Sequence, residues 1–349
     1  MTEEIIEEQS PSLPAISIVM AAHDHVSELE QHLPLMLEQD YPAGFEVIVV
    51  VSKGDDGTDD LLESMRRKHP NLYATFVPDS SRYMSRKKLA VTLGVKAAQN
   101  EWILLTEPEC APASTNWLRL MASHCQESVD MVMGYSNYSD EASGYKRYER
   151  AMFQHRLFSE TSRTAYRSEG HNLLFRKSMF MQGRGYDGNA QFVCGEYDFI
   201  VNKYATRGNT AAEQSPEAWL IEDAPTPKKW NNRHLYYMCT RKSLRRSFLH
   251  RLPFNAIQLL KHLWYLALLA AIVVTGLMQQ WLFLGIAALA LIVTLIVHAI
   301  VCKKLADAYS LDIPAVKALA FDLSYPWRAL CYKIKYLKAD KYDFTSHRL

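Results

Sequence analysis

Closely spaced cysteine pairs are missing from this 349-residue sequence, and so is any clear excess of charge of one sign. The six cysteines lie far apart and form no C-x-x-C pair, which argues against a zinc site or a disulfide framework and fits a reducing compartment. Because 39 Lys and Arg offset 38 Asp and Glu, the net charge gives no support for nucleic-acid binding. The first eight residues carry four glutamates and no apolar run, so we expect no signal peptide.

Asp, Glu, Lys and Arg are all absent from residues 262–302. A single helix of that length would measure roughly 60 Å, about twice the hydrocarbon thickness of a bilayer. Gln279-Gln280 divides the stretch, and Trp264, Tyr265 and Trp281 stand where interfacial aromatic residues are found. The sequence therefore predicts a two-span transmembrane hairpin over 262–302, or a re-entrant hairpin if the first span is too short to cross.

Basic residues flank this apolar stretch on both sides, among them Arg241, Lys242, Arg245, Arg246, Arg251, Lys303, Lys304, Lys317, Arg328, Lys333 and Lys335. By the positive-inside rule both flanks face the cytoplasm, as a two-span hairpin requires. We therefore expect a multi-pass protein of the inner (cytoplasmic) membrane, with 303–349 as a basic cytoplasmic tail. Residues 226–261 are expected to form a basic amphipathic segment at anionic lipid headgroups, with nucleic-acid binding as the weaker alternative.

Apolar runs alternate with helical patterns through the first part of the chain. The runs that read as buried strands are 16–20, 45–51, 73–77 and 102–105. This β-α-β-α-β-α-β order predicts a parallel sheet with right-handed crossovers, in a globular domain over residues 15–225. Residues 1–14 precede the domain as a charged lead-in that we expect to be mobile.

Two carboxylates, Glu107 and Glu109, follow the fourth apolar run directly and are separated only by Pro108. In open α/β sheets, ligands bind at the carboxyl ends of the strands. Carboxylate oxygens are ligands that Mg²⁺ and Mn²⁺ prefer, usually together with the phosphates of a substrate. The motif predicts a metal site there, although two glutamates also serve simply to keep a strand-to-helix loop soluble.

Together these features resemble the family 2 glycosyltransferases of the GT-A fold, particularly membrane-anchored bacterial members. The matching segments are 16–24 (the opening strand), 47–58 (the second strand and its acidic loop), 102–110 (the strand that ends in D-x-D), 170–176 (the strand after the active site) and 195–198 (the helix start that supplies the base). The resemblance implies an α/β, mostly parallel, Rossmann-like nucleotide-diphospho-sugar transferase fold, followed here by the transmembrane helical hairpin.

The resemblance further implies an inverting enzyme that uses Mg²⁺ or Mn²⁺ and a nucleotide-diphosphate sugar, with UDP as the commonest donor nucleotide of the family. The expected acceptor is a lipid-linked or cell-envelope glycan, as in polysaccharide biosynthesis, or a polyprenyl phosphate. The Q-x-x-R-W motif of processive synthases is absent, so transfer of a single sugar is expected. The alternative is a catalytically weak GT-A-like membrane module that binds a nucleotide sugar or a partner protein.

The resemblance also assigns site residues. Glu107 and Glu109 would hold the metal, and Glu196 or Asp198 would act as the catalytic base. The nucleotide-sugar-binding residues would be Ala21, Ala22, His23, Ser52, Asp55, Asp56, Lys87 and Glu107. The chain departs from the family pattern in its Glu-x-Glu motif, and in Tyr197, which falls where the base aspartate is expected. From the residues alone, Glu196 and Asp198 equally suit a helix N-terminus, and Lys87 equally suits a solvated helix start.

Overall fold

A computed structural model of the chain describes residues 13–52, 54, 56–78, 85–340 and 344. Of the lead-in expected over residues 1–14, only residues 13 and 14 are described. Asp55 lies outside the described residues. The chain divides into two compact units. The first comprises Met1–Asn137, Leu157–Asp223 and Thr345–Leu349, and the second comprises Tyr138–Arg156 and Ala224–Phe344.

The first unit is built on a seven-stranded sheet of order β3-β2-β1-β4-β8-β6-β9. Its strands are β1 (Ile16–Ala22), β2 (Phe45–Val51), β3 (Leu72–Phe76), β4 (Trp102–Thr106), β6 (Met131–Gly134), β8 (Leu173–Arg176) and β9 (Thr210–Glu213). Strands β1 to β4 pair in parallel, whereas β8 is antiparallel to both β4 and β6. The predicted mostly parallel α/β sheet is confirmed, and the chain order did not reveal that β8 runs against its neighbours.

Burial on both faces explains why the central strands read as unbroken apolar runs. Every residue of β4 is buried, as are the last five residues of β2. The helices and the short turn that belong to this unit are α1 (Val26–Leu37), α2 (Thr58–Arg66), α3 (Arg86–Ala97), α4 (Trp117–Ala122), α6 (Lys177–Gln182), α7 (Glu196–Tyr204) and the 3₁₀ turn η1 (Pro216–Ala218). Because β1, β2 and β4 are adjacent and parallel, their carboxyl ends meet at one edge of the sheet.

A smaller sheet of order β5-β10-β7 follows the end of β4. Its strands are β5 (Cys110–Pro112), β7 (Ser136–Tyr138) and β10 (Leu220–Glu222). Strands β5 and β10 are antiparallel, and Cys110 is the register partner of Glu222. This pairing with a distant segment holds the strand that begins immediately after the Glu-x-Glu motif.

The second unit is helical. It contains most of α5 (Gly144–Ser159) together with α8 (Pro227–Thr240), α9 (Ser247–Leu277), α10 (Trp281–Ala308) and α11 (Ala315–Lys338). Inside it, the buried Glu149 carboxylate accepts a hydrogen bond from His234 at 2.6 Å, and the His234 ring stacks on Tyr332. The tail expected from residue 303 is folded over much of its length as helix α11.

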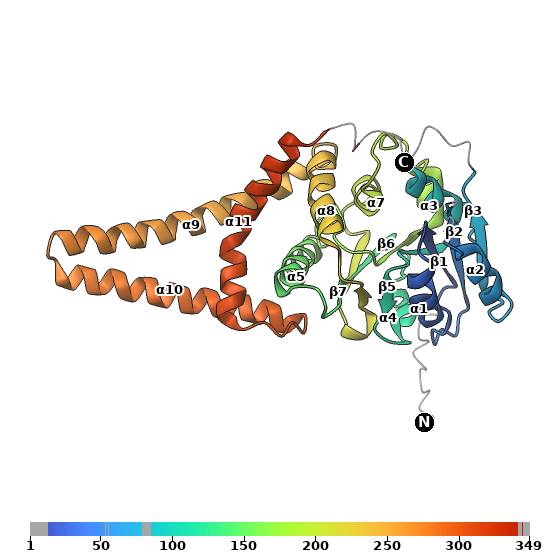
Figure 1. Ribbon diagram of the computed structural model, residues 1–349, viewed down its shortest axis with the longest axis horizontal. Coiled ribbons are helices and arrows are strands. Elements are labelled where there is room, and N and C mark those ends of the chain that lie inside the picture. Colours follow the sequence, from blue (N-terminus) through green and yellow to red (C-terminus); the bar gives the residue numbers. More distant parts are fainter. Residues whose placement is uncertain (1–12, 53, 55, 79–84, 341–343, 345–349) are drawn as a thin grey trace, which may run out of the picture. The chain divides into compact units, whose positions relative to one another are not determined.

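Helices α9 and α10 run side by side and are joined by a tight turn (Figure 1). Their apolar windows have mean hydropathies of 1.8 and 2.7, and only 17% and 6% of those windows are buried. They are thus unlike the core helices of a soluble domain, and their length and composition suit a membrane hairpin. Helix α9 begins at Ser247, well before the expected 262, and its Lys261 pairs with Asp322 of α11.

The beginning of α1 differs from the sequence prediction. Ser27 is a favoured N-cap residue type followed by an apolar helical stripe, which predicts that it caps the helix. In the structure it lies inside α1, and its hydroxyl donates to Glu28. The first backbone N–H, that of Val26, instead donates to Asp56 Oδ2 at 2.9 Å. A carboxylate from a distant loop therefore does what the local sequence assigned to a neighbouring serine.

Gly94 of α3 tests how closely this helix packs on the sheet. A Cβ atom at Gly94 would lie 2.4 Å from Cγ1 of the buried Val19 on β1. We expect Gly94→Ala to destabilise the protein by about 1–3 kcal/mol, because a stiff β-branched side chain in a strand cannot move aside. The measurement is thermal unfolding of the detergent-purified chain.

The matched control is Gly285→Ala in α10, where an added Cβ meets nothing within 4 Å. The gain in helix propensity should leave that variant as stable as the wild type or more so. If both variants unfolded at the wild-type temperature, the close contact between α3 and β1 would be wrong.

Candidate active site

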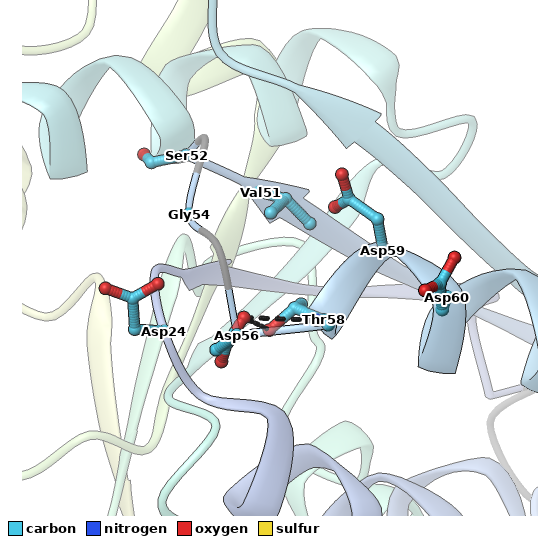
Figure 2. A pocket seen from close by; sticks show the side chains of 9 residues that line it. Asp24, Val51, Ser52, Gly54, Asp56, Thr58, Asp59 and Asp60 are labelled. Carbon is cyan, nitrogen blue, oxygen red and sulfur yellow. Dashed lines mark hydrogen bonds between the residues drawn. The ribbon is translucent and has the colours of Figure 1, made fainter.

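An acidic pocket of about 320 Å³ opens at the carboxyl ends of β1 and β2 (Figure 2). It is lined by Asp24, Val51, Ser52, Gly54, Asp56, Gly57, Thr58, Asp59 and Asp60. Of the predicted nucleotide-binding residues in the described part of this region, Ser52 and Asp56 line the pocket, whereas Ala21, Ala22 and His23 do not. Sequence reasoning missed Asp24, Asp59 and Asp60, which come together only because β1 and β2 are neighbours.

Asp56 has a structural task within this pocket. Its Oδ1 accepts hydrogen bonds from the backbone N–H and the hydroxyl of Thr58, and its Oδ2 accepts the bond from Val26. Desolvation opposes ionisation, but these hydrogen bonds outweigh it and lower the pKa of Asp56. The carboxylate thus ties the loop after β2 to the starts of α1 and α2, and it stays ionised.

The Glu-x-Glu motif lies at the end of β4, and its two carboxylates have different surroundings. Glu107 is buried and its Oε1 lies 2.7 Å from Nζ of Lys87. Glu109 is partly exposed, with Oε1 3.6 Å from Nε2 of His25. Burial lowers the pKa of His25, but the charges of Glu109, Glu28 and Glu107 outweigh it, so the net shift is upward.

Lys87 connects the end of β4 to the start of α7. Burial favours its neutral form, yet the negative charges of Glu107, Glu196 and Glu109 raise the pKa of Lys87 above its ordinary value. Lys87 therefore carries a full positive charge among three carboxylates, and 41% of its side chain remains exposed. Lys87, which the resemblance assigns to nucleotide-sugar binding, therefore lies beside the Glu-x-Glu end of β4.

Glu196 and Asp198 occupy the first turn of α7. Gly195 precedes them with φ of 88°, a left-handed conformation that favours glycine and sets the direction of the helix. Glu196 is buried, and its Oε1 forms no hydrogen bond among the residues that the structure describes. It lies in the electrostatic field of Lys87, so the sequence-predicted Glu196, Lys87 and Glu107 come together.

Asp198 belongs to a neighbouring group. Its Oδ2 is 3.7 Å from Nη1 of Arg167, which also pairs with Glu169. Burial raises the pKa of Asp198, Arg167 and a backbone hydrogen bond from Ser168 lower it, and Glu196 raises it again, giving a pKa of about 6. A carboxylate with that pKa can exchange a proton near neutral pH.

Tyr197 cannot replace the aspartate that the family pattern places there. Its ring is buried, and burial together with the negative charge of Glu107 raises the pKa of its hydroxyl well above the ordinary value. A phenol that stays protonated cannot accept a proton near pH 7. A base in this part of the site must therefore come from one of its two neighbours.

Lys88, although adjacent to Lys87, is a structural residue. It is fully buried, and its Nζ donates to the carbonyls of Asn189 at 2.9 Å and Phe192 at 2.6 Å. Burial lowers the pKa of Lys88 to about 8. Of these two lysines, only Lys87 faces the Glu-x-Glu carboxylates.

The Glu-x-Glu carboxylates fit a hard divalent cation that shares its coordination with a substrate. Mg²⁺ is commonly held by one or two carboxylates plus phosphate oxygens. Glu107 is already paired with Lys87, so Glu109 is the better placed ligand. In the described part of the chain, the clusters of three or more His, Cys, Asp or Glu ligand atoms include neither glutamate. Other ligands, such as phosphate oxygens, would have to complete such a site.

A mostly parallel sheet with carboxylates at the ends of β1, β2 and β4 is what the resemblance to GT-A transferases leads us to expect. Residues 14–212 match the model of the glycosyltransferase-like family 2, and the chain belongs to this family. It is therefore a glycosyltransferase. A search of curated proteins found no match.

A comparison with solved structures found similar chains. The mannosyltransferase PcManGT from Pyrobaculum calidifontis, solved with GDP-Man and Mn²⁺, is 18% identical over 92% of this chain and 88% of its own, with a TM-score of 0.52. S. aureus TarS residues 1–349, solved with UDP-GlcNAc, is 14% identical over 65% of this chain and 66% of its own, with a TM-score of 0.45. At these identities the comparison with PcManGT supports the GT-A fold.

The raised pKa of Asp198 has a consequence for stability. Since the folded-state pKa of about 6 lies above the ordinary 3.8, the native state binds the extra proton between these values, and stability falls as pH rises through this window. The loss is at most about 3 kcal/mol. We expect Asp198→Asn to remove this loss, so that the variant is more stable than the wild type at pH 7.5.

The measurement is the difference in unfolding temperature between Asp198→Asn and the wild type at pH 4 and pH 7.5. Comparing the two proteins cancels the titration of all other groups. A difference that did not grow in favour of the variant with rising pH would contradict the environment described for Asp198.

Proposed function

We propose that this glycosyltransferase is an inverting, metal-assisted enzyme that moves a single sugar from a nucleotide-diphosphate sugar to a lipid-linked or cell-envelope acceptor. The observation that carries the proposal is the group formed by Lys87, Glu107 and Glu196. In this group a partly exposed cation lies near the buried Glu196, whose Oε1 forms no hydrogen bond among the described residues. Inverting transfer needs these two components, a cation for the leaving diphosphate and a base for the acceptor hydroxyl.

The nucleotide-sugar donor would contact two places at this edge of the sheet, the acidic pocket and Lys87. The acidic pocket suits the nucleoside, because carboxylates accept hydrogen bonds from ribose hydroxyls and base N–H groups but repel phosphate. Lys87, in the first turn of α3 and beside Glu107 at the end of β4, suits the diphosphate. PcManGT was solved with GDP-Man, so GDP-sugars join UDP-sugars as candidate donors.

Glu109 would be the main protein ligand of Mg²⁺ or Mn²⁺, and Glu107 would serve chiefly to hold Lys87. When bound, the ion would neutralise charge on the departing diphosphate. The Mn²⁺ in the PcManGT complex supports the use of a divalent ion, although not the choice of ligands. The lysine ammonium would remain in place beside the phosphates whether or not the ion is bound.

Glu196 is our candidate for the base that takes the proton of the acceptor hydroxyl. Its buried Oε1 lies in the field of Lys87, whereas the carboxylate of Asp198 is paired with Arg167. Asp198 would hold its negative charge near Glu196 and so favour proton uptake by its neighbour. Both residues would thus contribute to the pH dependence of transfer.

The acceptor proposal rests on α9 and α10, whose apolar side chains are largely exposed. Placed in a bilayer as a hairpin, they would hold the enzyme where lipid-linked acceptors are found. The basic residues on both sides favour a cytoplasmic catalytic domain and C-terminus in the inner membrane. We retain 15–225, 226–261, 262–302 and 303–349 as proposed functional segments.

The test is transfer and donor hydrolysis by the detergent-purified protein over a panel of UDP- and GDP-sugars. Lipid extract and a soluble glycan serve as alternative acceptors, with Mn²⁺, Mg²⁺ or EDTA. We expect one donor to be used, EDTA to stop turnover, and the lipid fraction to be the better acceptor. Inversion is read from the anomeric configuration of the product.

We expect Glu196→Gln to lower the transfer rate about 10²–10⁴-fold while donor binding persists, and Glu109→Gln to remove the response to metal. The matched control is Glu127→Gln, an exposed residue before β6 and therefore at the opposite edge of the sheet, which should behave as wild type. Undiminished transfer by Glu196→Gln would refute the assignment of the base. Turnover unaffected by EDTA would refute the metal.

A further inference from the structure

A second group of metal-ligating side chains lies next to the Glu-x-Glu motif without sharing either glutamate. Cys110 begins β5, Glu222 ends β10, and His171 lies just before β8. One ligand atom from each, a sulfur, a carboxylate oxygen and an imidazole nitrogen, lies within 4.8 Å of the other two. We propose that Cys110, His171 and Glu222 form a binding site for a transition-metal ion of the Zn²⁺ type.

Backbone pairing fixes this group before any ion arrives. Cys110 and Glu222 are direct partners in the antiparallel pair of β5 and β10, which places their side chains on one face at about 5 Å between Cβ atoms. The backbone N–H of His171 donates to Ser136 Oγ at 3.1 Å, and its ring packs on Tyr197 with 5.1 Å between centroids. Such preorganisation suits a ligand site, because little ordering remains to be done on binding.

Burial and hydrogen bonding also favour an ion. Cys110 and Glu222 are 0% and 1% exposed, whereas the His171 side chain keeps 25% exposure and leaves a path for entry. Nδ1 of His171 is buried 3.1 Å from Glu222 Oε2, yet it forms no hydrogen bond among the described residues. A buried imidazole nitrogen beside a buried carboxylate is the arrangement that a metal ion would complete.

The ligand chemistry separates this site from the one at Glu107 and Glu109. Zn²⁺ takes thiolate, imidazole and carboxylate ligands, and three protein ligands leave a fourth position open. Mg²⁺ prefers oxygen ligands alone, so the two sites would select different ions. Binding would release the thiol proton of Cys110 to solvent.

Co²⁺ is the probe of choice, since a thiolate ligand gives it a charge-transfer absorption in the near ultraviolet. The full chain, reduced and freed of metal in detergent, is titrated with Co²⁺ in an excess of Mg²⁺. We expect the absorption to saturate at one ion per chain and to disappear when Zn²⁺ is added. It should be lost in Cys110→Ser and shifted to at least tenfold higher Co²⁺ concentration in His171→Gln and Glu222→Gln.

The control is Cys125→Ser, which changes a partly buried cysteine of the same unit and should keep the wild-type titration. Thermal unfolding shows that each variant is folded, and the two Gln variants retain the thiol if Cys110→Ser unfolds. Absence of the absorption in the wild type, or its persistence in Cys110→Ser, would overturn the proposal. Neither result bears on sugar transfer, so this site and the proposed function are tested separately.

Discussion

The ammonium group of Lys87 holds together carboxylates that would otherwise repel one another. Glu107 at the end of β4 is buried and pairs with it directly, while Glu196 at the start of α7 and Glu109 lie within its field. A buried carboxylate without such a partner costs several kcal/mol, so the positions of β4, α3 and α7 at this edge depend on one cation. The same cation remains partly exposed, where a diphosphate would meet it.

This interaction gives a physical meaning to the glutamates of the Glu-x-Glu motif. The extra methylene of Glu107, relative to aspartate, lets its carboxylate reach farther from the strand, and here it meets a lysine on α3. The two acidic positions thus divide their work. In the proposed function, Glu107 would hold the positive charge of Lys87, and Glu109 would bind a divalent ion together with the substrate.

Much of the fold was predictable from the sequence because the buried strands are continuous apolar runs and the helices alternate with them. The position of the Glu-x-Glu motif at the end of a buried strand was also predictable. The assignment of Lys87 and of the acidic start of α7 to the same site came from the resemblance to family 2 glycosyltransferases.

The remainder depends on contacts between distant segments. Lys87 and Lys88 are neighbours in the chain, yet successive positions of a helix point about 100° apart, and only packing decides which one is buried. Asp24 and Asp59 join the pocket through the pairing of β1 with β2. Cysteine spacing argued against a zinc site, but Cys110, His171 and Glu222 are brought together by sheet register rather than by spacing.

The central claim is that Lys87 binds the donor diphosphate, and equilibrium binding of UDP and GDP tests it most directly. Lys87→Met should weaken binding of the preferred nucleotide about 10- to 100-fold, as expected for loss of a hydrogen bond to a charged group of about 1.5–3 kcal/mol. Lys96→Met, an exposed change on the same helix, should bind as wild type does. The double variant Lys87→Met/Glu107→Gln relieves the unpaired buried charge and should still bind weakly. Wild-type affinity in the folded double variant would contradict the account.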